Sequence, residues 1–216
     1  MPDGRQPIPR KAVKPRRKPR PPDVLTPWPI LILAVDPGAN AGWAVYTHGQ
    51  YSDSGEVKAI ELDKIREIAW VVITLGRELG LKTVLVLEHH PWGGHGRRTA
   101  AGIEARKQTW RDAWRAAGGS PGRVVQMHVQ TWRSKLLGRP GRLLGRVEAR
   151  ALEQATAERI AGRPCGPDEA PAVCMGEVAT KSGLVGAKLP KSMREPPDPE
   201  TGGSFSNPDG KKSPPG

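Results

Sequence analysis

Apolar residues along the chain form either short continuous runs or longer segments in which they recur every three or four positions. Continuous runs at 29–35, 83–87 and 124–129 predict strands buried on both faces of a sheet. Two shorter runs, 42–47 and 51–60, flank a tight turn and predict a hairpin. Helical spacing predicts five helices, at 63–79, 99–117, 131–137, 141–160 and 168–180. Three strands followed by strands alternating with helices predict an α/β fold, a mixed five-stranded sheet flanked by helices.

The two ends of the chain differ from its middle in composition. Of the 23 prolines, 15 lie in residues 1–28 and 190–216. Such segments cannot bury enough apolar surface to offset the entropy that ordering would cost. We therefore expect a basic, proline-rich flexible arm over 1–27, one folded domain over 28–186, and a proline- and glycine-rich flexible tail over 187–216.

The charge of the chain is basic and concentrated near its N-terminus. The formal net charge is +12, and the first 22 residues carry eight lysines and arginines against one aspartate. A basic excess attracts polyanions, most often nucleic acid. The alternative is that this charge serves solubility alone.

The cysteine content and the length of the apolar runs indicate the compartment in which the protein is expected. Cys165 and Cys174 are the two cysteines, and their spacing indicates neither a disulfide framework nor a zinc site. No apolar run reaches the ~18–20 residues that a membrane span needs. The basic N-terminus is not followed by the apolar stretch of a signal peptide. These observations favour the reduced cytoplasm and no association with a membrane.

Acidic residues stand at the ends of the two most apolar strands. Asp36 ends the first, and Glu88 follows 83–87. A carboxylate there is costly to bury unless it is paired or binds a cation, and two on adjacent strands repel each other. Mg²⁺ prefers carboxylate oxygens, and two ions about 3.5–4 Å apart could activate water and stabilise a leaving oxygen. The alternative is that each acid only caps a strand–loop junction.

A third acid is expected from the last predicted helix. Asp168 and Glu169 open it, and the apolar residues that follow predict packing on the sheet. Acids at a helix N-terminus are also ordinary caps. We expect the first turn of this helix to lie near Asp36, with Asp36, Glu88 and Asp168 as metal ligands and Glu169 as a further catalytic candidate.

The segments that carry these acids resemble the motifs of RuvC-type Holliday junction resolvases. Leu33–Gly38 with Gly42–Val45 is similar to the first motif, Val84–Glu88 to the second and Asp168–Gly176 to the last. Residues 102–114 and 129–138 are similar to the phage-type branch of that family. The resemblance spans about residues 30–182 and implies an RNase H-like fold.

The resemblance also implies an activity and an assembly. It implies an endonuclease that resolves four-way (Holliday) or branched DNA with water activated by Mg²⁺, or by Mn²⁺ in its place, with two ions per site. It implies a homodimer that matches the two-fold symmetry of the junction, in a prokaryotic cell or a phage-infected host. Trp110 and Trp114 in the helix at 99–117 could form the dimer interface, or they could pack in the core of the monomer.

One position departs from the family pattern. The family usually has a fourth carboxylate one helical turn after Asp168, and this chain has Pro171 there. Proline offers no metal-binding side chain. In order of preference, a three-acid site suffices, Glu169 supplies the missing oxygen, or cleavage is lost.

Candidate DNA contacts follow the second acid and the fifth strand. Trp92, shortly after Glu88, resembles the aromatic residue that RuvC-like enzymes use near the junction, and stacking on an unpaired base is worth about 1–3 kcal/mol. The basic candidates are expected to contact phosphates, although a charge stripe is also often only a solvated face. The full set of candidates is Trp92, Arg97, Arg98, Trp132, Arg133, Lys135, Arg142, Arg146 and Arg150.

Three functions remain open on the sequence. The first is a resolvase of four-way or branched DNA. The second is a protein that binds junctions without cutting them, which the proline at position 171 motivates. The third is an RNase H-fold nuclease with another substrate, such as an RNA–DNA hybrid.

Overall fold

The computed structural model describes residues 30–89, 97–138 and 145–182. The arm predicted over 1–27, the tail predicted over 187–216, and the candidate DNA contacts Trp92 and Arg142 lie outside these residues.

The described residues form one five-stranded mixed sheet, as the sequence predicts. Its order is β3-β2-β1-β4-β5, in which β1, β2 and β3 are antiparallel neighbours and β1, β4 and β5 run parallel. The strands are β1 (Ile30–Asp36), β2 (Asn40–Thr47), β3 (Gln50–Lys58), β4 (Lys82–His89) and β5 (Val124–His128).

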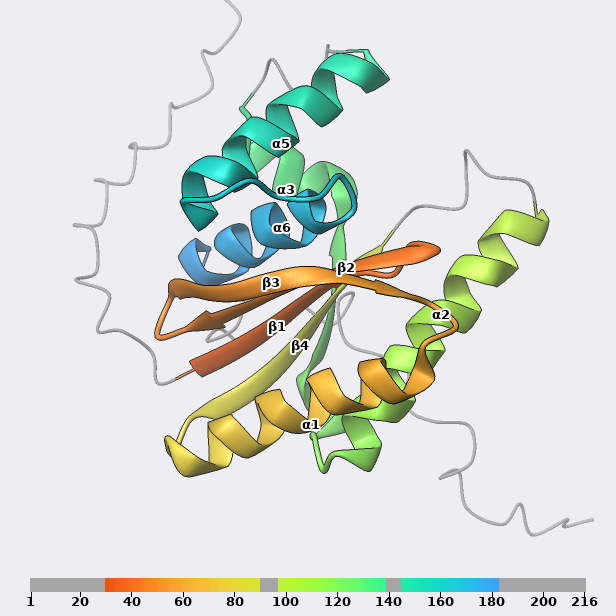
Figure 1. The fold of residues 1–216 in the computed structure, drawn as a ribbon, viewed down its shortest axis with the longest axis vertical. Coiled ribbons are helices and arrows are strands. Elements are labelled where there is room, and N and C mark those ends of the chain that lie inside the picture. The colour runs from red at the N-terminus through yellow and green to blue at the C-terminus, as the bar shows by residue number, and fades with distance from the viewer. Residues whose placement is uncertain (1–29, 90–96, 139–144, 183–216) are drawn as a thin grey trace, which may run out of the picture.

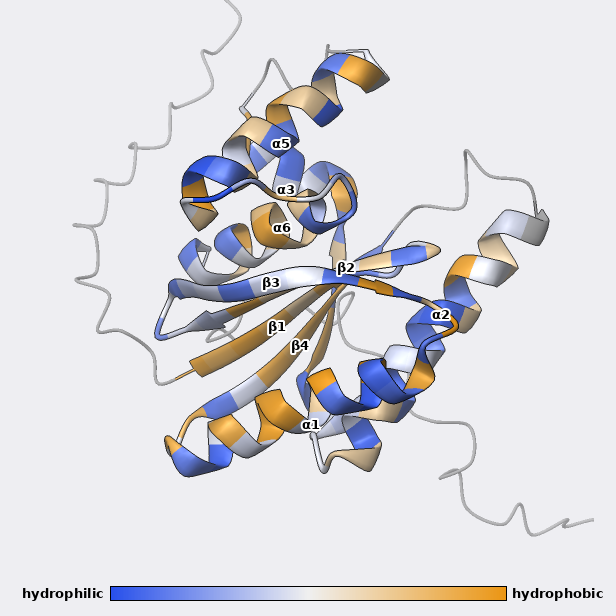
Figure 2. Cartoon of the chain, in the orientation of Figure 1, coloured by the Kyte–Doolittle hydropathy of each residue, from blue (hydrophilic) through white to orange (hydrophobic). Residues whose placement is uncertain are grey.

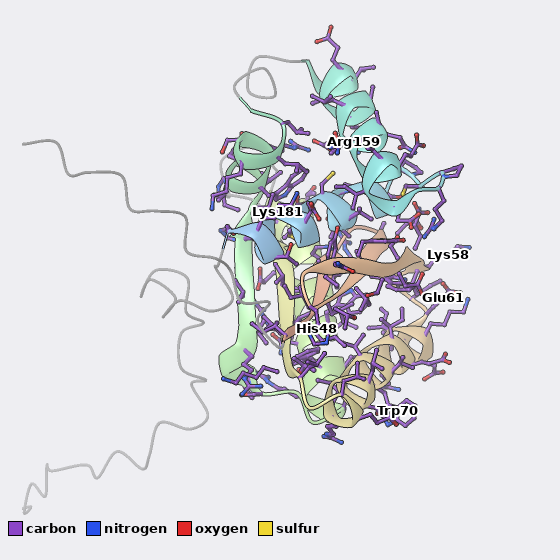
Figure 3. The ribbon with its side chains drawn as sticks, turned by 90° about the vertical axis from the view of Figure 1, so that its left-hand side faces the viewer. His48, Lys58, Glu61, Trp70, Arg159 and Lys181 are labelled. Atoms are coloured by element: carbon purple, nitrogen blue, oxygen red, sulfur yellow. The ribbon has the colours of Figure 1, made fainter. Side chains whose placement is uncertain are left out.

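Helices cover both faces of the sheet (Figure 1). One face carries α1 (Leu62–Glu78) and α2 (Arg97–Ala116). The other carries α3 (Val129–Leu136), α5 (Arg146–Ala161) and α6 (Glu169–Lys181). In the side view, Trp70 on α1 and Lys181 on α6 lie on opposite sides of the sheet (Figure 3). No helix among the described residues is long and apolar enough to cross a membrane.

The apolar run of β1 exists because this strand is covered on both sides. Ile30, Ile32 and Ala34 belong to the core under α6, and Leu31, Leu33 and Val35 belong to the core under α1 and α2. Hydropathy shows the same pattern, with β1 and the middle of β4 apolar and polar residues at the start of β4 (Figure 2). Because both faces of the strand are buried, a polar side chain is accommodated only at its end.

The structure corrects one expectation about the helices and decides between two alternatives for another. The helix predicted over 141–160 begins at Arg146, because Gly145 is extended (φ −60°, ψ 162°) and its N–H donates to the Glu148 carboxylate. Trp110 and Trp114 are buried in the core under α1 and α2. They pack within the monomer and so do not form a subunit interface.

Candidate active site

Asp36 and Glu88 lie beside each other at the ends of two parallel strands. Val35 pairs with Leu87 in the β1–β4 ladder, and the two acids are the next residues. Their carboxyl groups share a hydrogen bond, and burial, followed by the charge of Glu88, raises the pKa of Asp36 well above its usual range. Glu88 is 2% exposed. The structure therefore brings together the first two predicted metal ligands.

A tryptophan from α3 holds Glu88 in place. The indole Nε1 of Trp132 donates to Oε1 of Glu88 at 2.9 Å, and both side chains are buried. This corrects the expectation that Trp132 contacts DNA, because a fully buried ring offers no surface for a base. The buried hydrogen bond instead makes Trp132 a residue that orients the carboxylate of Glu88.

The backbone of Asp168 lies close to β2 because this strand carries a glycine opposite Asp36. Gly42 pairs with Asp36 in the β1–β2 ladder, and a Cβ at Gly42 would lie 1.7 Å from the carbonyl oxygen of Asp168. The start of α6 is thus pressed against β2, and the charge of Asp168 contributes to the raised pKa of Asp36. Glu56 of β3 fixes this approach, since its Oε1 accepts from the backbone N–H groups of Asp168 (3.0 Å) and Glu169 (3.1 Å).

Glu169 turns to a different set of partners. Its carboxylate accepts from Arg163 at 2.6 Å, from the Gly166 N–H at 2.8 Å and from the Ser54 hydroxyl. Burial alone would raise the pKa of Glu169, but the hydrogen bonds from Ser54 and Arg163 outweigh it and hold that pKa below its usual value. The structure therefore joins Glu169 to a contact between α6 and β3, and does not bring it to the hydrogen-bonded pair of Asp36 and Glu88.

Glu153 of α5 is an acid that the sequence reasoning missed. It is 2% exposed, and its Oε1 lies 2.6 Å from Nε of Arg133. Burial raises its pKa, Arg133 lowers it, and the charge of Glu88 raises it further. Ala149, Glu153 and Ala157 form the buried stripe of α5 at helical spacing. A lone acid in that stripe was the signal that could have revealed it.

Helix α2 brings positive charge to the same end of the sheet. Nε of Arg106 donates to the carbonyl oxygen of Pro37, directly after Asp36, at 3.0 Å. Nζ of Lys107 is buried, lies 3.1 Å from a carboxylate oxygen of Glu104, and is 3.4 Å from Nδ1 of His89. These contacts tie α2 to the loop after β1 and to the end of β4.

The acids offer only oxygen donors, the set that hard divalent cations prefer. Within residues 30–89, 97–138 and 145–182, no three histidine, cysteine or acidic side chains are arranged closely enough to hold a metal ion.

The basic residues predicted to contact DNA differ in how exposed they are and in which helix carries them. Lys135 on α3 and Arg150 on α5 are exposed, and Arg133 is partly buried beside Glu153. Arg97 and Arg98 stand in the first turn of α2, and Arg146 begins α5. The structure thus leaves Lys135 and Arg150 available to a phosphate.

Comparisons with protein-family models and with curated proteins find no match to this chain. Two solved structures of Thermus thermophilus RuvC are similar to it. One, in complex with a Holliday junction substrate, has a TM-score of 0.52 at 15% identity and covers 72% of this chain and 94% of that chain. The other has a TM-score of 0.50 at 16% identity and covers 71% and 94%. The fold is RuvC-like.

This likeness confirms the predicted fold class, an RNase H-like mixed sheet flanked by helices. At 15% and 16% identity it concerns the fold alone, and it does not distinguish the phage-type branch that the sequence predicts. In the RuvC-like fold of this chain, the carboxyl ends of β1 and β4 and the start of α6 meet at one place, where Asp36, Glu88 and Asp168 lie.

Proposed function

We propose that this protein is a structure-selective endonuclease that resolves four-way or branched DNA by metal-dependent hydrolysis of phosphodiester bonds. The observation that carries the proposal is the pair of half-buried Asp36 and buried Glu88 at neighbouring strand ends of a RuvC-like fold, with the start of α6, which carries Asp168, packed against β2 beside them. Buried acids that repel one another are costly to stability, and a site that keeps them is a candidate for cation binding and catalysis.

Asp36, Glu88 and Asp168 would hold Mg²⁺, or Mn²⁺ in its place, and two ions are expected per site. Such ions supply an activated water and stabilise the leaving oxygen of the phosphodiester. Binding would exchange the hydrogen bond between Asp36 and Glu88 for metal–oxygen contacts. The chemistry of the donor set fits a hard cation, because the three side chains are carboxylates.

The residues around these acids orient them. Trp132 fixes one oxygen of Glu88, while Gly42 and Glu56 together set the position of the Asp168 backbone. Outer contacts of this kind hold metal ligands in position, and their loss typically costs 10- to 100-fold in affinity or activity.

Branched DNA as the substrate is supported by charge and by fold. One structural neighbour is T. thermophilus RuvC in complex with a Holliday junction substrate. The chain carries a net charge of +12, and Lys135 and Arg150 are exposed on α3 and α5. Trp92, Arg97, Arg98, Arg142 and Arg146 remain proposed DNA contacts. A homodimer is proposed as well, because two cuts across a two-fold junction call for two sites.

A second candidate, a junction-binding protein that does not cut, is favoured by Pro171, which replaces the family's fourth carboxylate. A cleavage assay separates the candidates. Its substrates are a labelled immobile four-way junction, a linear duplex and an RNA–DNA hybrid, each in Mg²⁺ and in Mn²⁺. Paired symmetric nicks on the junction alone support the resolvase. Tight binding without a cut in either metal supports the second candidate, and cleavage of the hybrid alone identifies a different nuclease.

A further inference from the structure

We propose that Arg133 of α3 and Glu153 of α5 are positioning residues, which hold the indole of Trp132 in the orientation in which it donates to Glu88. The inference deepens the proposed function and rests on it, because Glu88 is there a ligand of the metal. Three successive contacts carry it, and they lead from α5 through α3 to the end of β4.

The three contacts join side chains from three elements of the fold. Nε of Arg133 lies 2.6 Å from Oε1 of Glu153. The guanidinium carbon of Arg133 lies over the ring of Trp132, 5.3 Å from its centre. The indole Nε1 of Trp132 donates to Oε1 of Glu88 at 2.9 Å. The position of Arg133 therefore affects the group that orients Glu88.

Burial restricts the side chains that make these contacts. Trp132, Glu88 and Glu153 are each 2% exposed or less, and the side chain of Arg133 is 27% exposed. A guanidinium over an indole face is attracted by the ring quadrupole, most strongly where water is excluded. Because Glu153 fixes the guanidinium and the guanidinium lies over the ring, the pair limits rotation of the indole.

The two carboxylates at the ends of this series of contacts also interact through their charges. Burial raises the pKa of Glu153, Arg133 lowers it, and the charge of Glu88 raises it again. The positive charge of Arg133 therefore lies close to two acids that repel each other. It compensates the charge of Glu153 directly, and it stands beside the ring whose N–H binds Glu88.

The geometry of the ion pair is poor for stability alone. A buried ion pair stabilises a fold only when its geometry is good and its polar atoms are satisfied. Nε of Arg133 and Oε1 of Glu153 have no hydrogen-bond partner among the described residues, although they lie 2.6 Å apart. Glu153 also lies between Ala149 and Ala157 on the buried stripe of α5, where an apolar side chain would need no partner. What the pair supplies is the orientation of Trp132.

The test follows the indole N–H of Trp132 by nuclear magnetic resonance of the isotope-labelled full chain, without metal or DNA. Its resonance is the one that Trp132→Phe removes. Arg133→Gln with Glu153→Gln removes both partners and leaves the net charge unchanged, and we expect the N–H then to exchange with deuterium at least about tenfold faster. The indole N–H of Trp114, which donates to the carbonyl oxygen of Ser120, is the internal reference and should exchange at its usual rate.

A second double variant separates orientation from folding. Arg133→Met with Glu153→Leu replaces the pair with apolar side chains, a change that is often neutral or stabilising. We expect it to unfold at the same urea concentration or a higher one, and still to show the faster exchange of the Trp132 N–H. Asp63→Asn with Arg66→Gln removes an exposed ion pair of α1, and this control should exchange as the unchanged protein does.

Junction cleavage distinguishes a positioning residue from a DNA contact. Both variants of the pair should cut about tenfold more slowly in a single turnover at saturating protein, with unchanged affinity for the junction. Lower affinity at an unchanged rate would make Arg133 a DNA contact and overturn the proposal. Slow exchange of the Trp132 N–H in either folded variant, as in the unchanged protein, would also overturn it and leave the proposed nuclease intact. Faster exchange in the variants of a protein that cuts no junction would overturn the nuclease and support the positioning of Trp132.

Discussion

The indole of Trp132 on α3 donates a hydrogen bond of 2.9 Å to Glu88 at the end of β4. The two residues are 44 positions apart in the sequence. Both side chains are buried. This bond occupies one carboxylate oxygen and sets the direction of the group, which also interacts with Asp36. A short helix after β5 thus controls the geometry of an acid on the neighbouring strand.

Replacing Trp132 with phenylalanine should therefore impair catalysis more than folding. A phenyl ring keeps the site apolar and fills part of the space of the indole, but Glu88 loses its donor, and loss of such an outer contact typically costs 10- to 100-fold in activity. Single-turnover cleavage of a four-way junction in Mg²⁺ measures the effect. Trp70→Phe is the matched control, because Trp70 on α1 is 59% exposed. A cleavage rate for Trp132→Phe equal to that of the control would contradict the role assigned to this bond.

Gly42 is the position where β2 admits the start of α6. A methyl group there would collide with the backbone of Asp168, since the distance to its carbonyl oxygen would be 1.7 Å. We expect Gly42→Ala to lower the free energy of unfolding by roughly 1–3 kcal/mol and to reduce cleavage by displacing Asp168. Urea unfolding measures the stability change. Gly102→Ala on α2 is the control, where the nearest atom is a side-chain nitrogen 3.6 Å away, and there a gain of up to about 1 kcal/mol is expected.

Glu169 should behave as a stabilising residue whose effect depends on pH. Its pKa is held below the usual value of about 4.3. Its contribution to stability is therefore present above that value and is lost as the pH falls through the lower pKa of the folded state. We expect Glu169→Gln to lower the free energy of unfolding by roughly 1–3 kcal/mol at pH 7. At an acidic pH below the lowered pKa of the folded state, the difference should shrink, because the unchanged protein has then lost the same charge.

Denaturant unfolding at the two pH values measures this difference. Glu67→Gln on the exposed face of α1 serves as the control. An equal loss of stability at both pH values would show that the charge of Glu169 is not what Arg163 and Ser54 stabilise. Complete loss of junction cleavage by a folded Glu169→Gln protein would instead restore Glu169 as a catalytic residue.

The acids of the site should lower the thermal stability of the metal-free protein. Burial and the charge of Glu88 disfavour ionised Asp36, and asparagine at this position keeps a hydrogen-bonding side chain without the charge. We expect Asp36→Asn to melt at a higher temperature than the unchanged protein in a chelating buffer at pH 7. Added Mg²⁺ should raise the melting temperature of the unchanged protein and leave that of the variant nearly constant. A lower melting temperature for the variant in the chelating buffer would contradict this account of Asp36.

The sheet could be predicted because the pattern of apolar residues in each strand depends on whether one or both of its faces are covered. A run such as Ile30–Val35 is continuous only in a strand covered on both faces, and Asp36 marks its end. That β1 and β4 are neighbours followed from topology, and with it the approach of Asp36 to Glu88. The start of α5 after Gly145 was missed, because the sequence on both sides of this glycine suits a helix.

The partners of the site residues could not be predicted, because they depend on tertiary packing. Helical spacing places Trp110 and Trp114 on the same face of a helix. It does not show whether that face packs against the monomer core or against a second subunit. Trp132 stood among basic residues and so suggested DNA, although its ring turns inward to Glu88. Glu153 lacked a motif, and its burial follows only from the packing of α5 on α6.

The most direct test of the central claim is cleavage of a labelled immobile four-way junction in Mg²⁺ by the unchanged protein and by Asp36→Asn. The account predicts paired, symmetric nicks by the unchanged protein and at least about a thousandfold slower cleavage by a folded variant that still binds the junction, since removing a central catalytic group costs on the order of 10³-fold or more. Equal cleavage by the two proteins would show that the acids at the ends of β1 and β4 are not the catalytic site. Binding without cleavage by the unchanged protein would show that it recognises junctions without resolving them.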